Sequence, residues 1–291
     1  MTERPGGRMG HRRSIATELV ARAVSDLVER ASFSMPAGVV DIYRAMRERE
    51  SSEIARHALD VLVENAAIAR GERLPLCQDC GVAIVFCDIG QDVALEGEYL
   101  HHAVDRGVCE AYERLYLRKS VVADPLARTN TGTNTPSFLH TDIVPGDRVG
   151  ITVYLKGGGS ENMSYLRMFR PTVSVDEIID HIASCVVDAG PNPCPPLFLG
   201  VGIGGTADLA LVNAKRSVLR GVGSIHPDPG YAELESRILE RVNGTGVGPL
   251  GFGGGSTAAA VYIKAAATHI ATLPVALNLN CHSLRYAETV L

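Results

Sequence analysis

Three cysteines stand in settings that suit metal binding. Cys77, Cys194 and Cys281 each lie in a turn rich in Pro, Gly or Asn, at the edge of an expected helix or strand. Three thiolates without a matching fourth suit an iron–sulfur cluster with one open iron, and an open metal position is what a Lewis-acid catalyst needs. Spacing alone does not separate this cluster from a zinc site. The cysteines inside apolar runs or helices are expected to pack as small apolar side chains: Cys87, Cys109 and Cys185.

Cys77 and Cys80 also form a C-x-x-C pair, a pattern found in zinc knuckles and redox dithiols. The sequence has no second such pair, and this one does not open a helix of a thioredoxin-like unit. The pattern therefore favours neither a zinc knuckle nor a redox dithiol.

Glycine clusters supply three further candidate sites. Residues 200–205 match G-x-G-x-x-G between an expected strand and helix, but the acidic partner of a dinucleotide site would fall in a turn near Asp228. A turn that presents N–H groups to an anion or a cluster sulfide explains these glycines equally well. Residues 156–160 and 251–255 lack the lysine that follows the last glycine of a P-loop. Their glycines suit either close approach to a small carboxylate or ordinary turns.

The elements that position these residues follow from periodicity. Ala55, Leu59, Leu62 and Ala66 recur at helical spacing, with Ser51 or Ser52 as the cap and Gly71 as the end. Further helices are expected from residue 98, over 176–189, after Thr206 and after Pro229. Strands are expected over 82–86, 149–155, 197–203 and 272–279, and a loop over 130–136. The sequence therefore predicts an α+β fold, with a helical N-terminal part followed by a mixed sheet and helices.

Composition narrows the class of protein. The 291 residues are 46% hydrophobic with a net charge of −5 and no Trp, which gives no case for nucleic acid binding. No apolar run is long enough for a membrane span, and no signal peptide is recognisable. Seven cysteines without regular spacing favour a reducing, cytoplasmic location. We expect a single domain over residues 1–291, with residues 1–12 as a flexible tail.

Several ordered motifs between Leu74 and Arg285 resemble the α-type domain of iron–sulfur hydro-lyases. This family includes the class I fumarate hydratases and the L(+)-tartrate dehydratases. The matching segments are residues 77–81, 117–126, 130–136, 156–164, 194–196, 200–206, 268–271 and 280–282. The sequence departs from the family at Cys80, where Thr is usual; a spare thiol is favoured over a cluster ligand.

The resemblance implies specific roles. A [4Fe-4S] cluster with one open iron would be held by Cys77, Cys194 and Cys281. The catalytic residues would be Asp79 and His269. The substrate carboxylates would be bound by Gln78, Arg118 and the Gly158 backbone, and Arg suits this because its planar fork binds a carboxylate bidentately.

The implied reaction is the reversible hydration of fumarate to L-malate, a step of the tricarboxylic acid cycle. The sequence resembles the split form of the enzyme, in which a separate β subunit carries the C-terminal-type domain, and a dimer of αβ pairs is expected. The α subunit of L(+)-tartrate dehydratase, which converts tartrate to oxaloacetate, is the alternative. An iron–sulfur electron carrier or sensor is a further alternative, although it would have no need of Asp79, Arg118 and His269.

Overall fold

The computed structural model describes residues 12–291, so the expected tail over residues 1–12 falls almost entirely outside the described part. The chain divides into two compact units that are each built from separate segments. Unit 1 takes the residues up to Ala31 with Cys80–Leu155 and Tyr286–Leu291, and unit 2 takes Ser32–Asp79 with Lys156–Arg285. Each unit has its own apolar core. That both units act as one domain stays a prediction.

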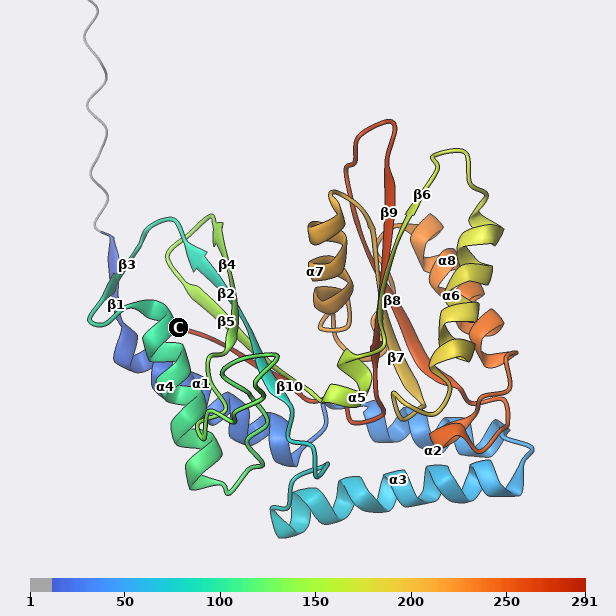
Figure 1. Cartoon of the computed structure of the whole chain (residues 1–291), viewed down its shortest axis with the longest axis horizontal. Helices are drawn as coiled ribbons and strands as arrows, with labels where there is room; N and C mark the ends of the chain where they lie inside the picture. Colours follow the sequence, from blue (N-terminus) through green and yellow to red (C-terminus); the bar gives the residue numbers. More distant parts are fainter. Residues whose placement is uncertain (1–11) are drawn as a thin grey trace, which may run out of the picture. The chain divides into compact units, whose positions relative to one another are not determined.

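Unit 1 is a four-stranded sheet covered by two helices. The strand order is β10-β5-β2-β4, with β10 and β5 antiparallel and β2 and β4 parallel. The strands are β2 (Val82–Gly90), β4 (Phe138–Val144), β5 (Val149–Lys156) and β10 (Tyr286–Val290). The apolar faces of α1 (Thr17–Phe33) and α4 (Leu100–Arg114) pack on this sheet (Figure 1). Two short strands, β1 (Arg13–Ala16) and β3 (Val93–Glu96), form a separate parallel pair.

Unit 2 is a four-stranded sheet with helices on both faces. The order is β6-β9-β7-β8, antiparallel except for the parallel pair β7 and β8. The strands are β6 (Ser164–Phe169), β7 (Leu197–Gly204), β8 (Ala258–Ala266) and β9 (Leu273–Asn280). Figure 1 shows α7 (Ala207–Ser217) on one face and α6 (Val175–Ala189) and α8 (Pro229–Asn243) on the other. Because helices cover both faces of the sheet, both faces of β7 are buried, which explains its continuous apolar run.

Helix packing accounts for the glycines of the G-x-G-x-x-G match. A Cβ on Gly200 would lie 1.9 Å from the carbonyl oxygen of Ala214, and one on Gly202 would lie 1.9 Å from that of Ala210. Only glycine lets the backbone of α7 approach β7 this closely. These two glycines are thus explained without a nucleotide or an anion.

The helices α2 (Val39–Arg49) and α3 (Glu53–Glu72) pack against each other in unit 2. Ser52 is the N-cap of α3, as predicted, and its hydroxyl accepts the N–H of Ala55 at 3.4 Å. The prediction that Gly71 ends this helix is wrong: the helix continues to Glu72, and Arg73 takes the left-handed conformation with φ 55°. The C-terminal end of α3 is therefore not marked by a glycine in the sequence.

The glycine-rich residues 251–255 start at the last residue of the short 3₁₀ helix η1 (Pro249–Gly251) and are anchored by a buried carboxylate. Glu50 accepts the N–H of Gly255 at 3.0 Å and the N–H of Ser51 at 2.9 Å. Burial would raise the pKa of Glu50, but these hydrogen bonds and one from Ser256 hold it below the usual range. The Gly255 N–H is therefore bonded to the protein itself, which supports the turn interpretation of this cluster.

The α+β fold and its helical N-terminal part are confirmed, as are the four expected strands and the main helices. The helix expected from residue 98 begins at Leu100. Within residues 12–291 the strands that were not predicted are β1, β3, β4, β6, β8 and β10. No helix of the described chain is long and apolar enough to cross a membrane.

Candidate functional site

The three candidate cluster cysteines lie in unit 2, two of them at the same end of its sheet. Cys194 precedes the start of β7, Cys281 directly follows the end of β9, and these strands are antiparallel with Phe198 opposite Asn280. Cys77 lies in the loop after α3. All seven cysteines of the chain are free thiols, and Cys87 and Cys185 are buried as predicted.

Hydrogen bonds fasten the Cys281 segment to the Cys194 loop. The main-chain N–H of His282 donates to the carbonyl oxygen of Cys194 at 3.0 Å, and the His282 Nδ1 lies 3.2 Å from the same oxygen. The hydroxyl of Tyr43, on α2, donates to the carbonyl oxygen of His282. Burial lowers the pKa of His282 to about 4, so its ring is neutral at physiological pH. Residues far apart in the sequence thus hold two cysteines side by side.

The electrostatics of the thiols bring Cys77 into the same group. Burial raises the pKa of the Cys194 thiol, and the negative charge of Cys77 raises it further. Burial also raises the pKa of Cys281; Arg285 and Lys156 oppose this rise, while Cys77 adds to it. Since Cys77 acts on both of the other thiols, the three sulfurs share one electrostatic environment.

The donor set fits an iron–sulfur cluster, whose protein ligands are cysteine thiolates. Within residues 12–291, no three His, Cys, Asp or Glu side chains are grouped closely enough to hold one metal ion. Two buried polar atoms near Cys281, the Oγ of Ser283 and the Nε of Arg285, have no hydrogen-bond partner in the described chain. Both carry a hydrogen, and the sulfurs of iron–sulfur clusters accept such hydrogen bonds. Three thiols with unused donors beside them therefore match the cofactor that the sequence implied.

Cys80 belongs to the core of unit 1. It is 4% exposed, and its sulfur accepts the main-chain N–H of Arg118 at 3.1 Å. The hydroxyl of Tyr112 donates to the carbonyl oxygens of Cys80 and Gly81 at 3.0 and 2.9 Å. Cys80 thus has a structural role in that unit, which supports the spare-thiol interpretation.

The glycine-rich residues after β5 connect two of the cysteine loops. The N–H of Gly158 donates to Oδ2 of Asp79 at 2.7 Å, and a Cβ on Gly157 would lie 3.0 Å from the same oxygen. A Cβ on Gly159 would lie 3.0 Å from the carbonyl oxygen of Asn192. These glycines begin the four-residue helix α5 (Gly158–Glu161) and pack against both the Cys77 loop and the Cys194 loop.

Lys156 is a buried cation that the sequence analysis did not select. It is 1% exposed, and its Nζ donates to Ser160 Oγ and to the Leu279 carbonyl oxygen, both at 3.2 Å. Its Nζ also lies 3.3 Å from Glu161, whose carboxylate is shared with Lys215. Burial lowers the pKa of Lys156 to about 8. The sequence signal for this lysine is its position directly before the glycine run, since a lysine at the end of a strand is by itself common.

The other predicted site residues are placed differently. Gln78 is exposed, with its Oε1 3.4 Å from the Cys77 sulfur. Arg118 is exposed and belongs to unit 1. His269 is exposed in the turn between β8 and β9, where its Nδ1 accepts the N–H of Ala271 at 3.1 Å. Because Cys281 lies at the other end of β9, roughly 25 Å of strand separates it from His269. Unit 2 therefore does not bring His269 to its own cysteines.

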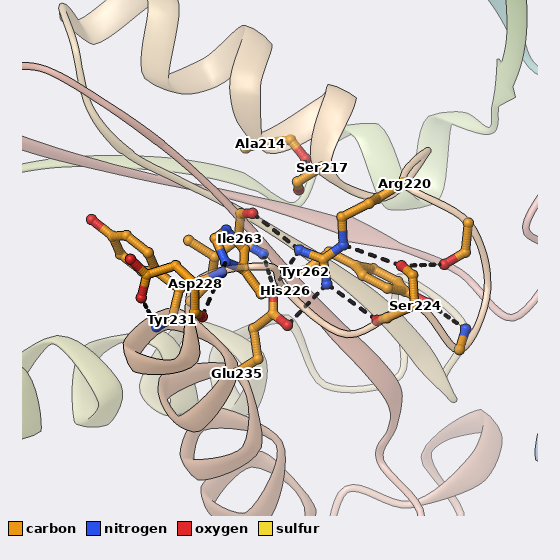
Figure 2. A network of polar contacts seen from close by, with 12 residues as sticks. Ala214, Ser217, Arg220, Ser224, His226, Asp228, Tyr231, Glu235, Tyr262 and Ile263 are labelled. Atoms are coloured by element: carbon orange, nitrogen blue, oxygen red, sulfur yellow. Dashed lines mark hydrogen bonds and ion pairs between the residues drawn. The ribbon is translucent and has the colours of Figure 1, made fainter.

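Residues 223–229 form an anchored turn, as Figure 2 shows. Arg220, which precedes the turn, pairs bidentately with Glu235 at 2.8 and 2.9 Å, and its Nε donates to Ser224 Oγ at 3.1 Å. The Asp228 carboxylate caps α8 by accepting the N–H of Gly230 at 2.8 Å. Figure 2 places these residues around Tyr262 of β8, and their polar groups are engaged in contacts within the protein.

A surface depression of about 690 Å³ lies elsewhere in unit 2, over β6 and α6. Its lining includes Arg167 and His181, whose Nη1 and Nδ1 lie 3.3 Å apart. None of the predicted site residues lines it. We therefore place the candidate site at the cysteines.

The chain belongs to the fumarate hydratase (Fumerase) family, whose model matches residues 21–290. Its relatives carry a more specific name. A Methanocaldococcus jannaschii protein provisionally named L(+)-tartrate dehydratase subunit alpha is 39% identical over 275 residues, which cover 92% of this chain and 96% of that protein. The L(+)-tartrate dehydratase subunit alpha of Escherichia coli K12 is 31% identical over 274 residues, covering 93% of this chain and 90% of that protein. The family is thus confirmed, and the names favour the tartrate alternative over fumarate.

Proposed function

We propose that this chain is the α subunit of an iron–sulfur L(+)-tartrate dehydratase, which converts tartrate to oxaloacetate and water. The observation that carries the proposal is the group of three thiols, Cys77, Cys194 and Cys281, with unused hydrogen-bond donors beside it. The names of the similar proteins support tartrate as the substrate.

In this proposal the three thiolates hold a [4Fe-4S] cluster. When bound, the cluster supplies an open iron that acts as a Lewis acid on a substrate hydroxyl. The chain's own residues bind and orient the substrate. Gln78, the Arg118 guanidinium and the Gly158 N–H bind its carboxylates, and Asp79 positions or moves a proton at the hydroxyl that leaves. Further carboxylate-binding groups and the base come from a separate β subunit.

His269 takes part only if another copy of the chain supplies it. Its turn lies at the opposite end of β9 from Cys281. A dimer of αβ pairs, as expected from the resemblance, would let the His269 of one copy complete the site of the other. The assembly works in a reducing compartment, which we expect to be the cytoplasm.

Fumarate hydration to L-malate is the second candidate. The matching family is named after this reaction. The reverse reaction, dehydration of L-malate, and the dehydration of tartrate both eliminate water from a C4 hydroxy-dicarboxylate. One site could therefore serve either substrate with different contacts to the second hydroxyl of tartrate.

The test is an anaerobic assay of the chain, alone and with its β partner, on L(+)-tartrate and L-malate side by side. Oxaloacetate formation from tartrate in the mixture alone, at a higher kcat/KM than for malate, is the expected result. A preference for malate would keep the mechanism and change the substrate. Inactivity on both substrates with an intact cluster would overturn the hydro-lyase proposal and favour the electron carrier.

The cofactor has its own test. We expect Cys194→Ser to abolish the binding of iron and labile sulfide, whereas Cys185→Ser, which changes a buried thiol of α6, leaves both near the wild-type content. Full iron content in Cys194→Ser would exclude the proposed ligand set. Bound zinc without labile sulfide in the wild-type protein would instead support a structural zinc site.

A further inference from the structure

Arg285 is a buried cation whose role the site described so far leaves unexplained. It lies four residues after Cys281 (285 − 281) and is 2% exposed. A guanidinium stays charged at every physiological pH, so its burial requires compensation by hydrogen bonds or by negative charge. Within residues 12–291 no carboxylate forms an ion pair with it, and its Nε has no hydrogen-bond partner.

The contacts of Arg285 join two parts of the candidate site. Its Nη1 donates to the main-chain carbonyl oxygen of Asp79 at 2.7 Å. Its Nη2 lies 3.4 Å from the position that a Cβ of Gly157 would occupy. The guanidinium therefore lies next to both the loop that carries Asp79 and the glycine-rich turn, which contacts the Asp79 carboxylate.

A second buried cation lies in the same region of unit 2. Arg285 follows Cys281 by four residues, and the Nζ of Lys156 donates to the carbonyl oxygen of Leu279, two residues before Cys281. Lys156 already donates to Ser160 and Leu279 and pairs with Glu161, whereas Arg285 retains the free Nε donor.

We propose that Arg285 is the positioning residue of this site: it fixes the Asp79 loop against the Cys281 segment and supplies the positive charge that faces the cluster. This inference rests on the proposed function, because it requires a cluster on the three thiols. In the loaded protein the Nε–H of Arg285 donates to a cluster or cysteine sulfur. A donor and a positive charge close to an iron–sulfur cluster make its reduction easier.

Two substitutions separate the geometry from the charge. Arg285→Lys keeps the positive charge but loses the fork that can reach Asp79 and a sulfur together. Arg285→Gln removes the charge and keeps an amide that can still donate to the Asp79 carbonyl oxygen. The matched control is Arg220→Lys, which changes a largely buried arginine of the same unit that pairs with Glu235 away from the site.

Each variant is purified anaerobically as the complete αβ complex, and four quantities are measured: iron and sulfide content, the reduction potential of the cluster by redox titration with electron paramagnetic resonance, kcat and KM. We expect Arg285→Gln to bind a cluster with a more negative potential than wild type. We expect Arg285→Lys, which keeps the charge and loses the Nε–H donor, to shift the potential less than Arg285→Gln does and to lose about tenfold in kcat, because Asp79 is no longer held. Arg220→Lys should leave potential and kcat unchanged.

A wild-type potential and kcat in Arg285→Gln, at full iron content, would overturn the inference. If Arg285→Gln does not fold, Arg285→Lys decides: wild-type kcat and KM in that variant would equally overturn the positioning role. Failure of the proposed function is distinguishable, because in that case the wild-type complex itself would hold no cluster or would turn over neither substrate.

Discussion

The Asp79 carboxylate accepts the main-chain N–H of Gly158 at 2.7 Å. Both residues are expected at the substrate, yet in this structure each satisfies the other. In the proposed function, a substrate carboxylate that binds the Gly158 N–H would take the place of Asp79. This exchange would couple substrate binding to the placement of the carboxyl group proposed to move the proton.

Substitution of Asp79 tests that coupling. Asp79→Asn keeps an oxygen that can accept the Gly158 N–H but cannot hold or deliver the proton of a carboxyl group. We expect kcat to fall by at least about 100-fold, the usual effect of losing a general acid or base, with unchanged iron content. Asp188→Asn, an exposed change on α6, serves as the control. A loss of kcat below tenfold would remove Asp79 from the catalytic residues.

The position of His269 predicts complementation between two inactive chains. His269→Asn and Cys281→Ser should each be inactive as complete complexes. If His269 serves the site of another copy, refolded mixtures of the two variants contain some sites with both native residues. We expect such mixtures to recover roughly a quarter of the wild-type activity by random pairing of chains in a two-fold assembly. Activity that stays at the level of the separate variants would show that the two residues act in the same copy or that His269 has no role.

Lys156 predicts a pH-dependent stability. Burial lowers its pKa from 10.5 to about 8, so between pH 8 and 10.5 the unfolded chain binds one proton more than the folded chain. The contribution of Lys156 to stability therefore rises over this window, by an amount on the order of 3 kcal/mol.

Urea unfolding of the reduced chain at pH 7.5 and pH 10.5 measures this effect. Lys156→Met lacks the titrating group, so its stability relative to wild type should decline by about 3 kcal/mol between the two pH values. Lys264→Met, which changes an exposed lysine of β8, should show no such change. Parallel pH profiles for wild type and Lys156→Met would contradict the lowered pKa.

The close contact between β7 and α7 predicts a large effect of a single methyl group. In Gly202→Ala the new Cβ would lie 1.9 Å from the Ala210 carbonyl oxygen, which forces the helix away from the strand. We expect a loss of stability of about 3 kcal/mol, as for an overpacked core, in thermal or urea unfolding. Gly71→Ala is the control: its Cβ would contact nothing within 4 Å and should stabilise α3 slightly. Equal stability of both variants would disprove the packing argument.

The elements that could be predicted from the sequence are those with a strong local signal. The helix α6 has a capping box between Ser174 and Glu177 and an apolar face, and β7 is an unbroken apolar run, so both were located closely. The strands β4 and β6 were missed because most of their residues are exposed or half-buried, which leaves little alternation. β4 and β6 form by pairing with β2 and β9, and pairing between segments far apart in the sequence leaves no local signal.

The reactive groups of the candidate site could be predicted from the sequence, whereas the buried charged residues near them could not. Turn context selected Cys77, Cys194 and Cys281, and the structure places their thiols in one electrostatic environment. Arg285 and Lys156 were not selected, because a charged residue next to a strand is usually solvated and only the fold shows that these two are buried. His269 and Cys281 lie far apart because they flank opposite ends of β9, and the periodicity of the sequence does not reveal this distance.

The cysteine segments lie 204 residues apart along the chain (281 − 77), and the bond from His282 to Cys194 exists only after β9 has paired with β7. A growing polypeptide that has exposed Cys77 alone offers iron a single thiol and no enclosure. Delivery of the proposed cluster would therefore be a late event in biogenesis, and the donor of iron and sulfide would have to recognise a nearly finished fold rather than a nascent peptide.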